Sequence, residues 1–560
     1  MQKWTRVMYQ PNLPLGENGE KVTASSKHIT LSKEAAKEGM VLLKNDGDLL
    51  PLAKGSKVAL FGKASFDYVR GGGGSGEVTV SYARNLYEGL SLLKDKINVF
   101  EELAAYYRDN VKAQYQQGRV PGMTVEPEVP MELLKKASAY TDTAIITICR
   151  FSGEGWDRKS IVDTENKNLC ITEEAMAKQS AEIFEDGDFC LTHAERAMVD
   201  TVTANFPKVI VVMNVGGMVD SCWFHDSAKI QSVLMAWQGG IEGGLATAEL
   251  LIGEGNPSGK LVDTFARALT DYPSTDNFHA SERFVDYIED IYVGYRYFET
   301  IPDADKKVNY PFGFGLSYTD FTLTAGAAYG QNNKIYVPVV VTNVGKRAGK
   351  EVVQAYFSAP QGVLGKPAKQ LVAFQKTRLL QTGESQSIVL SWDVNDMASY
   401  DDLGKIKASA YILEKGMYRF FVGASVRDVV ELSYQYEVQE NTVVQQLSRK
   451  CAPTSLKKRM LADGSYEELP ILEPVDTDAN ELTPLTVDET DGFTPAARAG
   501  KRYHLWTNTA AQQHHFLKEV AEGTITLDEF MAQLSDEQLA HLLGGQPNTG
   551  VANTFGWGNL

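Results

Sequence analysis

Two short apolar runs, each leading into a glycine-rich segment, constrain the fold of this chain more than any other feature of its sequence. The runs are residues 58–61 and 144–149, and the segments that follow them are residues 70–76 and 150–158. Apolar runs of this kind are typical of strands that are covered on both faces in a parallel sheet. Ligands of such sheets bind beyond the carboxyl ends of the strands. Both glycine-rich segments are therefore expected at the binding edge of an α/β sheet.

The second segment presents one carboxylate, that of Glu154, between two glycines. Glycines allow backbone torsions and close approaches that a Cβ would block, so this carboxylate can be aimed at a substrate. Trp156 adds an apolar wall and Arg158 a fixed positive charge. Glu154 is therefore a candidate catalytic acid, with an ordinary surface turn as the alternative. We expect Arg158 to pair with Asp157 or another acid and to hold the segment in place.

The first segment, residues 70–76, does not fit a nucleotide site. It lacks the lysine of the phosphate-binding GxxxxGK[ST] pattern, and its glycines match the dinucleotide-binding GxGxxG pattern only in part. No acidic residue for a ribose is evident at the required distance. A flexible linker is disfavoured because the segment lies inside an α/β pattern. What remains is a loop whose backbone approaches a polar ligand closely, and Ser75 is its only hydroxyl.

The apolar pattern divides the chain into two folded parts. From about residue 31 to 268, apolar runs alternate with helical stretches, which predicts a largely parallel sheet with helices on both faces. The expected strands are 58–61, 144–149, 209–213 and 233–237, with a helix at 194–205 before the third. From about residue 321 to 440 the pattern changes to period two, which predicts an antiparallel β-sandwich. Its clearest strands are 335–341, 352–357 and 418–422.

Charge and composition exclude several classes of partner. The formal net charge of −17 over 560 residues disfavours nucleic acid and anionic membranes, since both need a basic surface. No apolar run approaches the roughly 18 residues that span a membrane, and no hydrophobic secretory segment follows the start, so we expect a cytoplasmic protein. The five cysteines have no CxxC spacing, which favours reduced thiols over disulfides or zinc. Cys149 and Cys222 lie in apolar surroundings and are expected in the core. We expect neither a metal nor a cofactor.

An ordered series of motifs resembles the carboxy-terminal half of glycoside hydrolase family 3 β-glucosidases. The motifs extend over about residues 30 to 440 and are KVALFG, GGGGSG, SGEGWDR, VIVVMNVGG, AWQGGIEGG, GNPSGKL, DIYVGYRYFE, YPFGFGLSYT and VTNVGKRAGKEVVQAYF. The resemblance implies an α/β-sandwich domain followed by a fibronectin type III-like domain. It also implies that Glu154 is the general acid/base and that Ser75 reaches the sugar. The implied function is a retaining, exo-acting β-glucosidase that removes terminal non-reducing β-D-glucosyl residues by double displacement.

The domain order departs from that of most family members. They begin with a (β/α)8 barrel that carries the nucleophilic aspartate, whereas this chain begins with the α/β-sandwich domain. Residues 526–539 resemble the opening of the family's barrel. Two capping boxes, Thr526 with Glu529 and Ser535 with Gln538, predict helix starts there. A whole barrel takes about 250 residues. We therefore expect the rest of it, with the nucleophile, on another chain or in a missing segment, and a barrel polypeptide as the partner.

Together these patterns predict six segments and leave three questions open. The segments are an extended N-terminal arm at 1–29, the α/β-sandwich domain with the acid/base loop at 30–275, a connecting segment at 276–320, the fibronectin type III-like domain at 321–440, a linker at 441–510 and the start of the barrel at 511–560. The linker is long for a free loop, so we expect it to wrap over another domain. A β-xylosidase or another family 3 β-glycosidase is one alternative. A carbohydrate-binding or structural polypeptide, inactive by itself, is another, and a homo-oligomer stays open.

Overall fold

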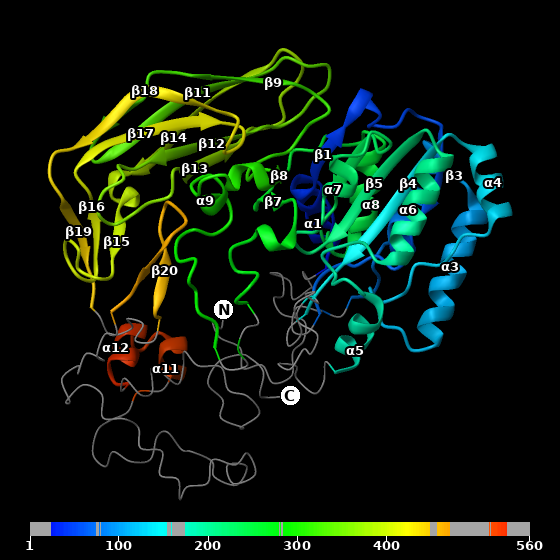
Figure 1. Cartoon of the computed structure of the whole chain (residues 1–560), viewed down its shortest axis with the longest axis horizontal. Helices are drawn as coiled ribbons and strands as arrows, with labels where there is room; N and C mark the ends of the chain where they lie inside the picture. Colours follow the sequence, from blue (N-terminus) through cyan, green and yellow to red (C-terminus); the bar gives the residue numbers. More distant parts are fainter. Residues whose placement is uncertain are drawn as a thin grey trace, which may run out of the picture. The chain divides into compact units, whose positions relative to one another are not determined.

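The computed structural model divides into two units, residues 26–474 and residues 1–25 together with 475–560. The residues that it describes are 24–73, 78, 80–153, 158, 174–278, 281, 284–448, 456–470, 515 and 517–534. The first unit contains an α/β domain and a β-sandwich (Figure 1).

A six-stranded sheet forms the centre of the α/β domain. Its strands, in spatial order, are β1 (Val41–Asn45), β6 (Ser232–Met235), β5 (Lys208–Val215), β4 (Thr143–Arg150), β2 (Ser56–Phe61) and β3 (Ile97–Val99). All neighbouring strands are parallel except the edge pair of β1 and β6. The four predicted strands and the largely parallel sheet are therefore confirmed. The sequence pattern did not identify β1 or β3, because runs this short show no clear period.

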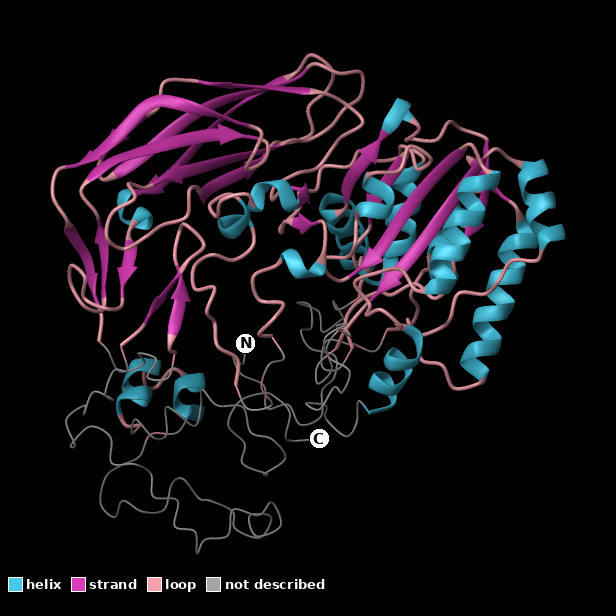
Figure 2. Ribbon diagram, viewed as in Figure 1, coloured by secondary structure: helices cyan, strands magenta, loops and turns pink. Residues whose placement is uncertain are grey.

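Helices cover both faces of this sheet, as the alternating pattern predicts (Figure 2). One face packs against α3 (Glu101–Gln116), α4 (Met131–Tyr140), α6 (His193–Asn205) and α7 (Cys222–His225). The other face packs against α1 (Ser26–Gly39), α2 (Leu86–Leu92) and α8 (Gly243–Leu251). A further helix, α5 (Glu174–Ile183), precedes α6. The helix predicted at 194–205 is confirmed as α6, which begins with a capping box formed by Thr192 and Glu195.

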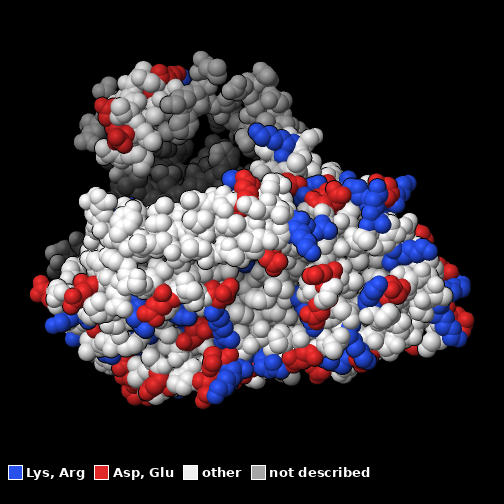
Figure 3. All heavy atoms as spheres, turned by 90° about the horizontal axis from the view of Figure 1, so that it is seen from above, with Lys and Arg blue, Asp and Glu red and all other residues white. Residues whose placement is uncertain are grey.

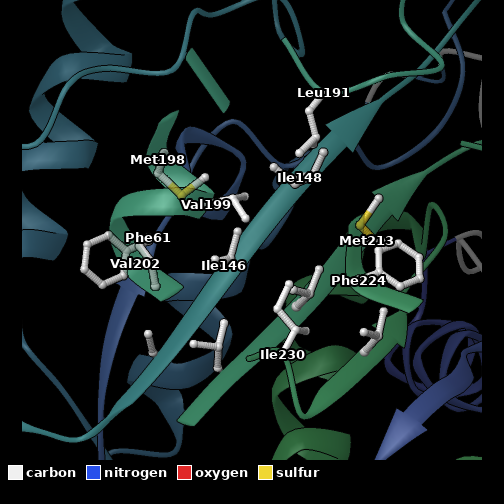
Figure 4. Packing of buried hydrophobic residues seen from close by; sticks show 14 of the residues in the cluster. Phe61, Ile146, Ile148, Leu191, Met198, Val199, Val202, Met213, Phe224 and Ile230 are labelled. Atoms are coloured by element: carbon white, nitrogen blue, oxygen red, sulfur yellow. The ribbon is translucent and has the colours of Figure 1, made fainter. Parts of the chain in front are cut away.

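Strand β4 shows why the sheet needs a helical layer on each side. Ile146 and Ile148 belong to the cluster on one face, whereas Ile145 belongs to the cluster on the other. Figure 4 shows Ile146 near Val199 of α6 and Ile148 near Leu191, in the same cluster. Burying each of these branched side chains stabilises the fold by about 1.5–3 kcal/mol. A strand with apolar side chains on both faces is thus held at a fixed position, and with it the segment that follows.

Helix α1 begins inside the segment that was predicted to be an extended arm. Residues 26–29 are helical, so the arm prediction is wrong for these residues. Lys33 and Lys37 of α1 form ion pairs with Glu249 in α8, which fix the helix on the domain. No residue of α1 is buried. This agrees with its sequence, which has no strong apolar stripe by which a helix could be predicted here instead of an extended arm.

The β-sandwich predicted from period-two segments is confirmed. One sheet contains β9 (Phe321–Ala325), β10 (Tyr329–Gln331), β11 (Lys334–Asn343) and β14 (Ser385–Asp393). The other has the order β13 (Gln370–Lys376), β12 (Val352–Ser358), β17 (Gly416–Gly423) and β18 (Val429–Val438). All strand pairs in both sheets are antiparallel. Alternate residues of β11, including Val337, Val339 and Val341, are buried in the core between the sheets.

Smaller elements connect and extend these domains. The connecting segment carries α9 (Tyr295–Phe298) and β8 (Val308–Tyr310), which pairs with β7 (Phe265–Ala266). A further small sheet of β15 (Ser399–Asp401), β16 (Ala410–Leu413) and β19 (Thr442–Gln446) continues strand pairing past residue 440. Within the predicted linker, β20 (Lys458–Met460) and β21 (Tyr466–Glu468) form a hairpin. Arg459 of this hairpin pairs with Asp402, and the amide of Met460 donates to the carbonyl of Ile288. The described part of the linker is therefore folded onto other segments of the first unit.

The described part of the second unit contains two short helices, α11 (Leu517–Glu522) and α12 (Leu527–Ala532). The capping box of Thr526 and Glu529 at the start of α12 is confirmed. The second predicted box, Ser535 with Gln538, lies outside the described residues. In the part of the chain that the structure describes, no helix is long and apolar enough to cross a bilayer.

Candidate functional site

The two glycine-rich segments lie side by side at the carboxyl edge of the sheet. They follow β2 and β4, which are parallel neighbours. Gly73 forms a parallel bridge with Gly153, and the amide of Gly73 donates to the carbonyl of Ser152 at 3.1 Å. The expected position of both segments is confirmed for their described residues. The two candidate side chains, those of Ser75 and Glu154, follow the bridged glycines in sequence and lie outside the described residues.

Close backbone approach explains one glycine at this edge. Gly62 follows β2 directly and has a φ of +91°. A Cβ at this position would lie 2.3 Å from the carbonyl oxygen of Thr147 in β4. A larger residue is therefore excluded both by space and by backbone conformation. The chain after β2 can pass this close to β4 only because residue 62 is glycine.

Arg150, the last residue of β4, anchors the start of the candidate acid/base segment. Its guanidinium donates to both carboxylate oxygens of Glu195, at 2.8 and 2.6 Å, and both side chains are buried. Burial by itself disfavours the charged form of Glu195. The guanidinium and the hydrogen bonds from Arg150 and Thr192 outweigh that effect and hold the pKa of Glu195 below its usual value. The two groups therefore form a bidentate pair of full charges, which fixes orientation as well as distance.

Arg158 anchors the end of the same segment. Its Nε lies 3.0 and 2.9 Å from the two carboxylate oxygens of Asp188, and its Nη1 donates to the carbonyl of Met218 at 2.6 Å. The expectation that Arg158 pairs with an acid is thus confirmed with Asp188 as the acid. Asp157, the other candidate, lies outside the described residues.

Beneath these loops lies a buried charged cluster that the sequence did not predict. Lys63 donates to Asp67 at 3.1 Å and to the carbonyl of Gly122 at 2.9 Å, and its Nζ lies 3.1 Å from the sulfur of Cys149. Cys149 is buried as expected, and burial raises its pKa to about 11, so the thiol stays protonated. The cluster joins the chain after β2 to the end of β4. Cys222 is only partly buried, so its expected core position is wrong.

The side chain of Asn214 links the backbone just before the glycine-rich segment 70–76 to the backbone that follows β6. Asn214 of β5 is fully buried, and its side chain accepts from the amide and donates to the carbonyl of Val69, at 2.7 and 2.8 Å. It also donates to the carbonyl of Trp237, a residue with a φ of +52°. Both ends of the amide are therefore used to fix backbone. The signal in the sequence is one polar residue inside the apolar run VIVVMNV.

Glu126 is a buried acid near the same edge. Its carboxylate accepts from the amide of Lys63 and from the hydroxyl of Tyr107, both at 2.8 Å. Burial raises the pKa of Glu126 to about 7, although these hydrogen bonds oppose the shift. The residue also lines a mostly apolar cavity of about 340 Å³ with Phe61 and Met198.

The described residues offer no metal site, since no three His, Cys, Asp or Glu side chains gather among them in a way that could hold an ion. On the face that Figure 3 shows, acidic and basic side chains are interspersed rather than gathered into one basic area. Buried ion pairs instead hold Arg150 and Arg158, at the two ends of the candidate acid/base segment, and fix the chain that follows β2.

Comparison with known proteins identifies the family. Residues 40–318 match the glycosyl hydrolase family 3 C-terminal domain, and residues 351–426 match the fibronectin type III-like domain. Over its whole length the chain is 57% identical to a protein named β-glucosidase A from Butyrivibrio fibrisolvens, of which it covers 70%. The chain therefore belongs to glycoside hydrolase family 3 and is a glycoside hydrolase polypeptide.

Other relatives share less of their length with this chain. A β-glucosidase from Ruminococcus albus is 37% identical over 93% of the chain, which covers 51% of that protein. The structure of a β-glucosidase from Paenibacillus barengoltzii superimposes with a TM-score of 0.75 and 36% identity, over 94% of this chain and 56% of that one. β-Glucosidase 3B from Thermotoga neapolitana, solved with α-D-glucose, gives a TM-score of 0.64 at 35% identity over 76% of this chain and 56% of its own. The chain thus spans little more than half of these three relatives.

Proposed function

We propose that this chain forms part of a retaining, exo-acting β-glucosidase that removes terminal non-reducing β-D-glucosyl residues. The observation that carries the proposal is the 57% identity with a relative named β-glucosidase A, over the whole of this chain. The bridge between Gly73 and Gly153 supports it, because it brings the two loops with candidate sugar-binding and acid/base groups together.

In the proposed mechanism Glu154 is the general acid/base. Retaining glycosidases use two carboxyl groups about 5–5.5 Å apart. One attacks the anomeric carbon, and the other first protonates the leaving oxygen and then takes a proton from the attacking water. Glu154 takes the second role, and Ser75 donates a hydrogen bond to a sugar hydroxyl. The nucleophile comes from a barrel domain outside these 560 residues.

The charges around the acid/base segment are compatible with this role. A general acid must be protonated in part near neutral pH, and an unpaired arginine nearby would lower its pKa. Arg158 is four residues from Glu154 in sequence, but its guanidinium is paired with the carboxylate of Asp188. Likewise Arg150 is paired with Glu195. The two positive charges at the ends of the segment are thus each paired with a carboxylate.

The test is reconstitution with a barrel polypeptide. We expect the 560-residue chain by itself not to hydrolyse nitrophenyl β-glucoside, and the mixture with a family 3 barrel polypeptide to do so. Mass spectrometry of the purified active sample should detect both parts. Robust hydrolysis by the 560 residues alone contradicts the proposed division of the catalytic residues. No hydrolysis of any aryl glycoside by the reconstituted sample favours a carbohydrate-binding or structural polypeptide.

A different sugar specificity is the second candidate. The chain is 28% identical, over 72% of its length, to a protein from Bifidobacterium breve named exo-α-(1→6)-L-arabinopyranosidase. Specificity within the proposal is tested with nitrophenyl β-glucoside, β-xyloside and α-L-arabinopyranoside side by side. We expect the highest kcat/KM for the glucoside. A higher value for either pentoside would replace the glucosidase assignment and leave the acid/base assignment unchanged.

A further inference from the structure

We propose that Asp188 is a positioning residue that holds both ends of the segment carrying Glu154. This segment leaves β4 at Arg150 and reaches Arg158 eight positions later. Asp188 lies far from both in sequence but contacts both arginines. The catalytic consequence of this inference rests on the proposed function, whereas the anchoring itself does not.

The carboxylate of Asp188 holds the far end. Both of its oxygens lie within 3.0 Å of the Nε of Arg158. The Asp188 side chain is 5% exposed and that of Arg158 is 21% exposed, so water competes little for this pair. Burial raises the pKa of Asp188, and the guanidinium of Arg158 counters that shift. The net direction of the Asp188 pKa shift is upward, and the ion pair with Arg158 limits the rise.

The backbone carbonyl of Asp188 joins the two ends. It accepts from the Nε of Arg150 at 2.9 Å and from the Nη2 of Arg158 at 3.1 Å. One oxygen atom thus lies between the side chains at the two ends of the segment. Because this contact uses backbone, substituting the side chain leaves it available. Asp188→Asn therefore removes one charge and keeps the shape of the anchor.

The two arginines at this anchor have different carboxylate partners. Arg150 forms its ion pair with Glu195, whereas the carboxylate of Asp188 forms its ion pair with Arg158. Without the charge of Asp188, Arg158 is held by the carbonyl groups of Met218 and Asp188. Hydrogen bonds to neutral acceptors are weaker than those to a carboxylate. The loss is therefore expected at the Arg158 end of the segment.

A looser segment should affect the acid step more than other steps. A general acid works only within hydrogen-bond reach of the leaving oxygen, and a misplacement of about 1 Å can cost 10²-fold in rate. Cellobiose has a poor leaving group that needs this proton. Nitrophenolate leaves readily without it. A positioning defect therefore changes the ratio of the two rates, whereas a loss of folded protein lowers both equally.

The anchoring is tested on the chain itself by limited proteolysis. Trypsin cleaves after Arg158 only when that side chain leaves Asp188. We expect Asp188→Asn to accelerate cleavage after Arg158, measured by mass spectrometry of the native protein. The matched control is Asp142→Asn, which removes an aspartate from the exposed pair with Lys208 at the other end of β4. Equal cleavage rates after Arg158 in the parent and in Asp188→Asn overturn the anchoring.

The catalytic consequence is tested in the active enzyme that contains the barrel. We expect Asp188→Asn and Arg158→Gln each to lower kcat/KM for cellobiose relative to nitrophenyl β-glucoside by about 10-fold or more. Asp142→Asn should leave the ratio unchanged. If Glu154→Ala changes the ratio and neither anchor variant does, Asp188 does not position the acid and the inference is wrong. If Glu154→Ala also leaves the ratio unchanged, the proposed function fails, and the proteolysis result still decides the anchoring.

Discussion

The ion pairs at the two ends of β4 differ in how far their side chains are exposed to solvent. At the amino end, Asp142 and Lys208 form an ion pair whose side chains are 55% and 50% exposed. At the carboxyl end, the side chains of Arg150 and Glu195 are 2% and 3% exposed. The pair of Lys63 and Asp67, also at this end, is buried as well.

This difference indicates where the sheet needs fixed geometry. Removing two charges from water costs several kcal/mol, and apolar side chains of similar volume usually stabilise a fold as well or better. At the amino end this desolvation cost is small because the pair stays in water. At the carboxyl end, where the two glycine-rich segments begin, the pairs are buried and the cost is present. Buried pairs with bidentate geometry hold loops in one position, which is what a site for a sugar and a proton transfer requires.

The largest effect is expected from Glu154 itself. In the active enzyme, Glu154→Ala should lower turnover of cellobiose by about 10²- to 10⁴-fold, because protonation of a poor leaving group is lost. Substrates with good leaving groups should still form the glycosyl intermediate at a nearly normal rate. The measurement is steady-state and burst kinetics on both kinds of substrate. An unchanged rate on cellobiose would show that Glu154 is not the general acid, and the buried pairs beside it would then have no role in catalysis.

Next in size is the stability difference between the two ends of β4. Arg150→Met leaves Glu195 as an unpaired buried carboxylate and should cost about 3–5 kcal/mol in the free energy of unfolding. Lys208→Met, at the exposed end, should cost about 0–1 kcal/mol. Urea unfolding of both variants measures the difference. Equal losses in the free energy of unfolding would show that the buried pair contributes no more to stability than the exposed pair.

Glu126 gives a pH-dependent effect of intermediate size. Its pKa is raised from 4.5 to about 7 in the folded protein. Its contribution to stability is therefore fully present below pH 4.5 and is lost as the pH rises through about 7, a change of about 3 kcal/mol. Glu126→Gln, which resembles the protonated form, should remove this slope from the pH dependence of the free energy of unfolding. Glu128→Gln, an exposed neighbour, should leave the slope in place. A parallel pH profile for Glu126→Gln and the parent protein would contradict the assignment.

The smallest effect is expected at Ser75. If its hydroxyl donates to a sugar hydroxyl, Ser75→Ala should cost on the order of 1 kcal/mol in kcat/KM and leave stability almost unchanged. A structure with bound sugar provides a second check, since a side-chain hydrogen bond needs heavy atoms within about 3.2 Å. A Ser75 hydroxyl more than about 8 Å from both sugar and Glu154 would exclude this role.

The sequence predicted those parts of the fold that depend on local pattern. Strands β2, β4, β5 and β6 were predictable because continuous apolar runs identify strands that are buried on both faces. The capping box at Thr526 was predictable because both of its members lie within one helical turn. The edge shared by the two glycine-rich segments followed from the direction of parallel strands.

The contacts that support the site could not be predicted in the same way. Asp188 lies thirty positions from Arg158, and Glu195 lies forty-five from Arg150. Nothing in a single sequence indicates which acid meets which arginine over such distances. The contact of Lys63 with Cys149 depends on the spatial order of β2 and β4, which the pattern leaves open. These contacts come from tertiary packing, and the structure is needed to find them.

Azide rescue shows whether Glu154 of this chain is the acid/base of a retaining β-glucosidase. In Glu154→Ala, water attacks the glycosyl intermediate without a general base, whereas azide is a nucleophile that needs none. With an aryl β-glucoside as substrate, added azide should accelerate turnover and give β-glucosyl azide, with retained configuration, as the product. No acceleration by azide would exclude Glu154 as the acid/base, and an α-glucosyl azide product would exclude a retaining mechanism.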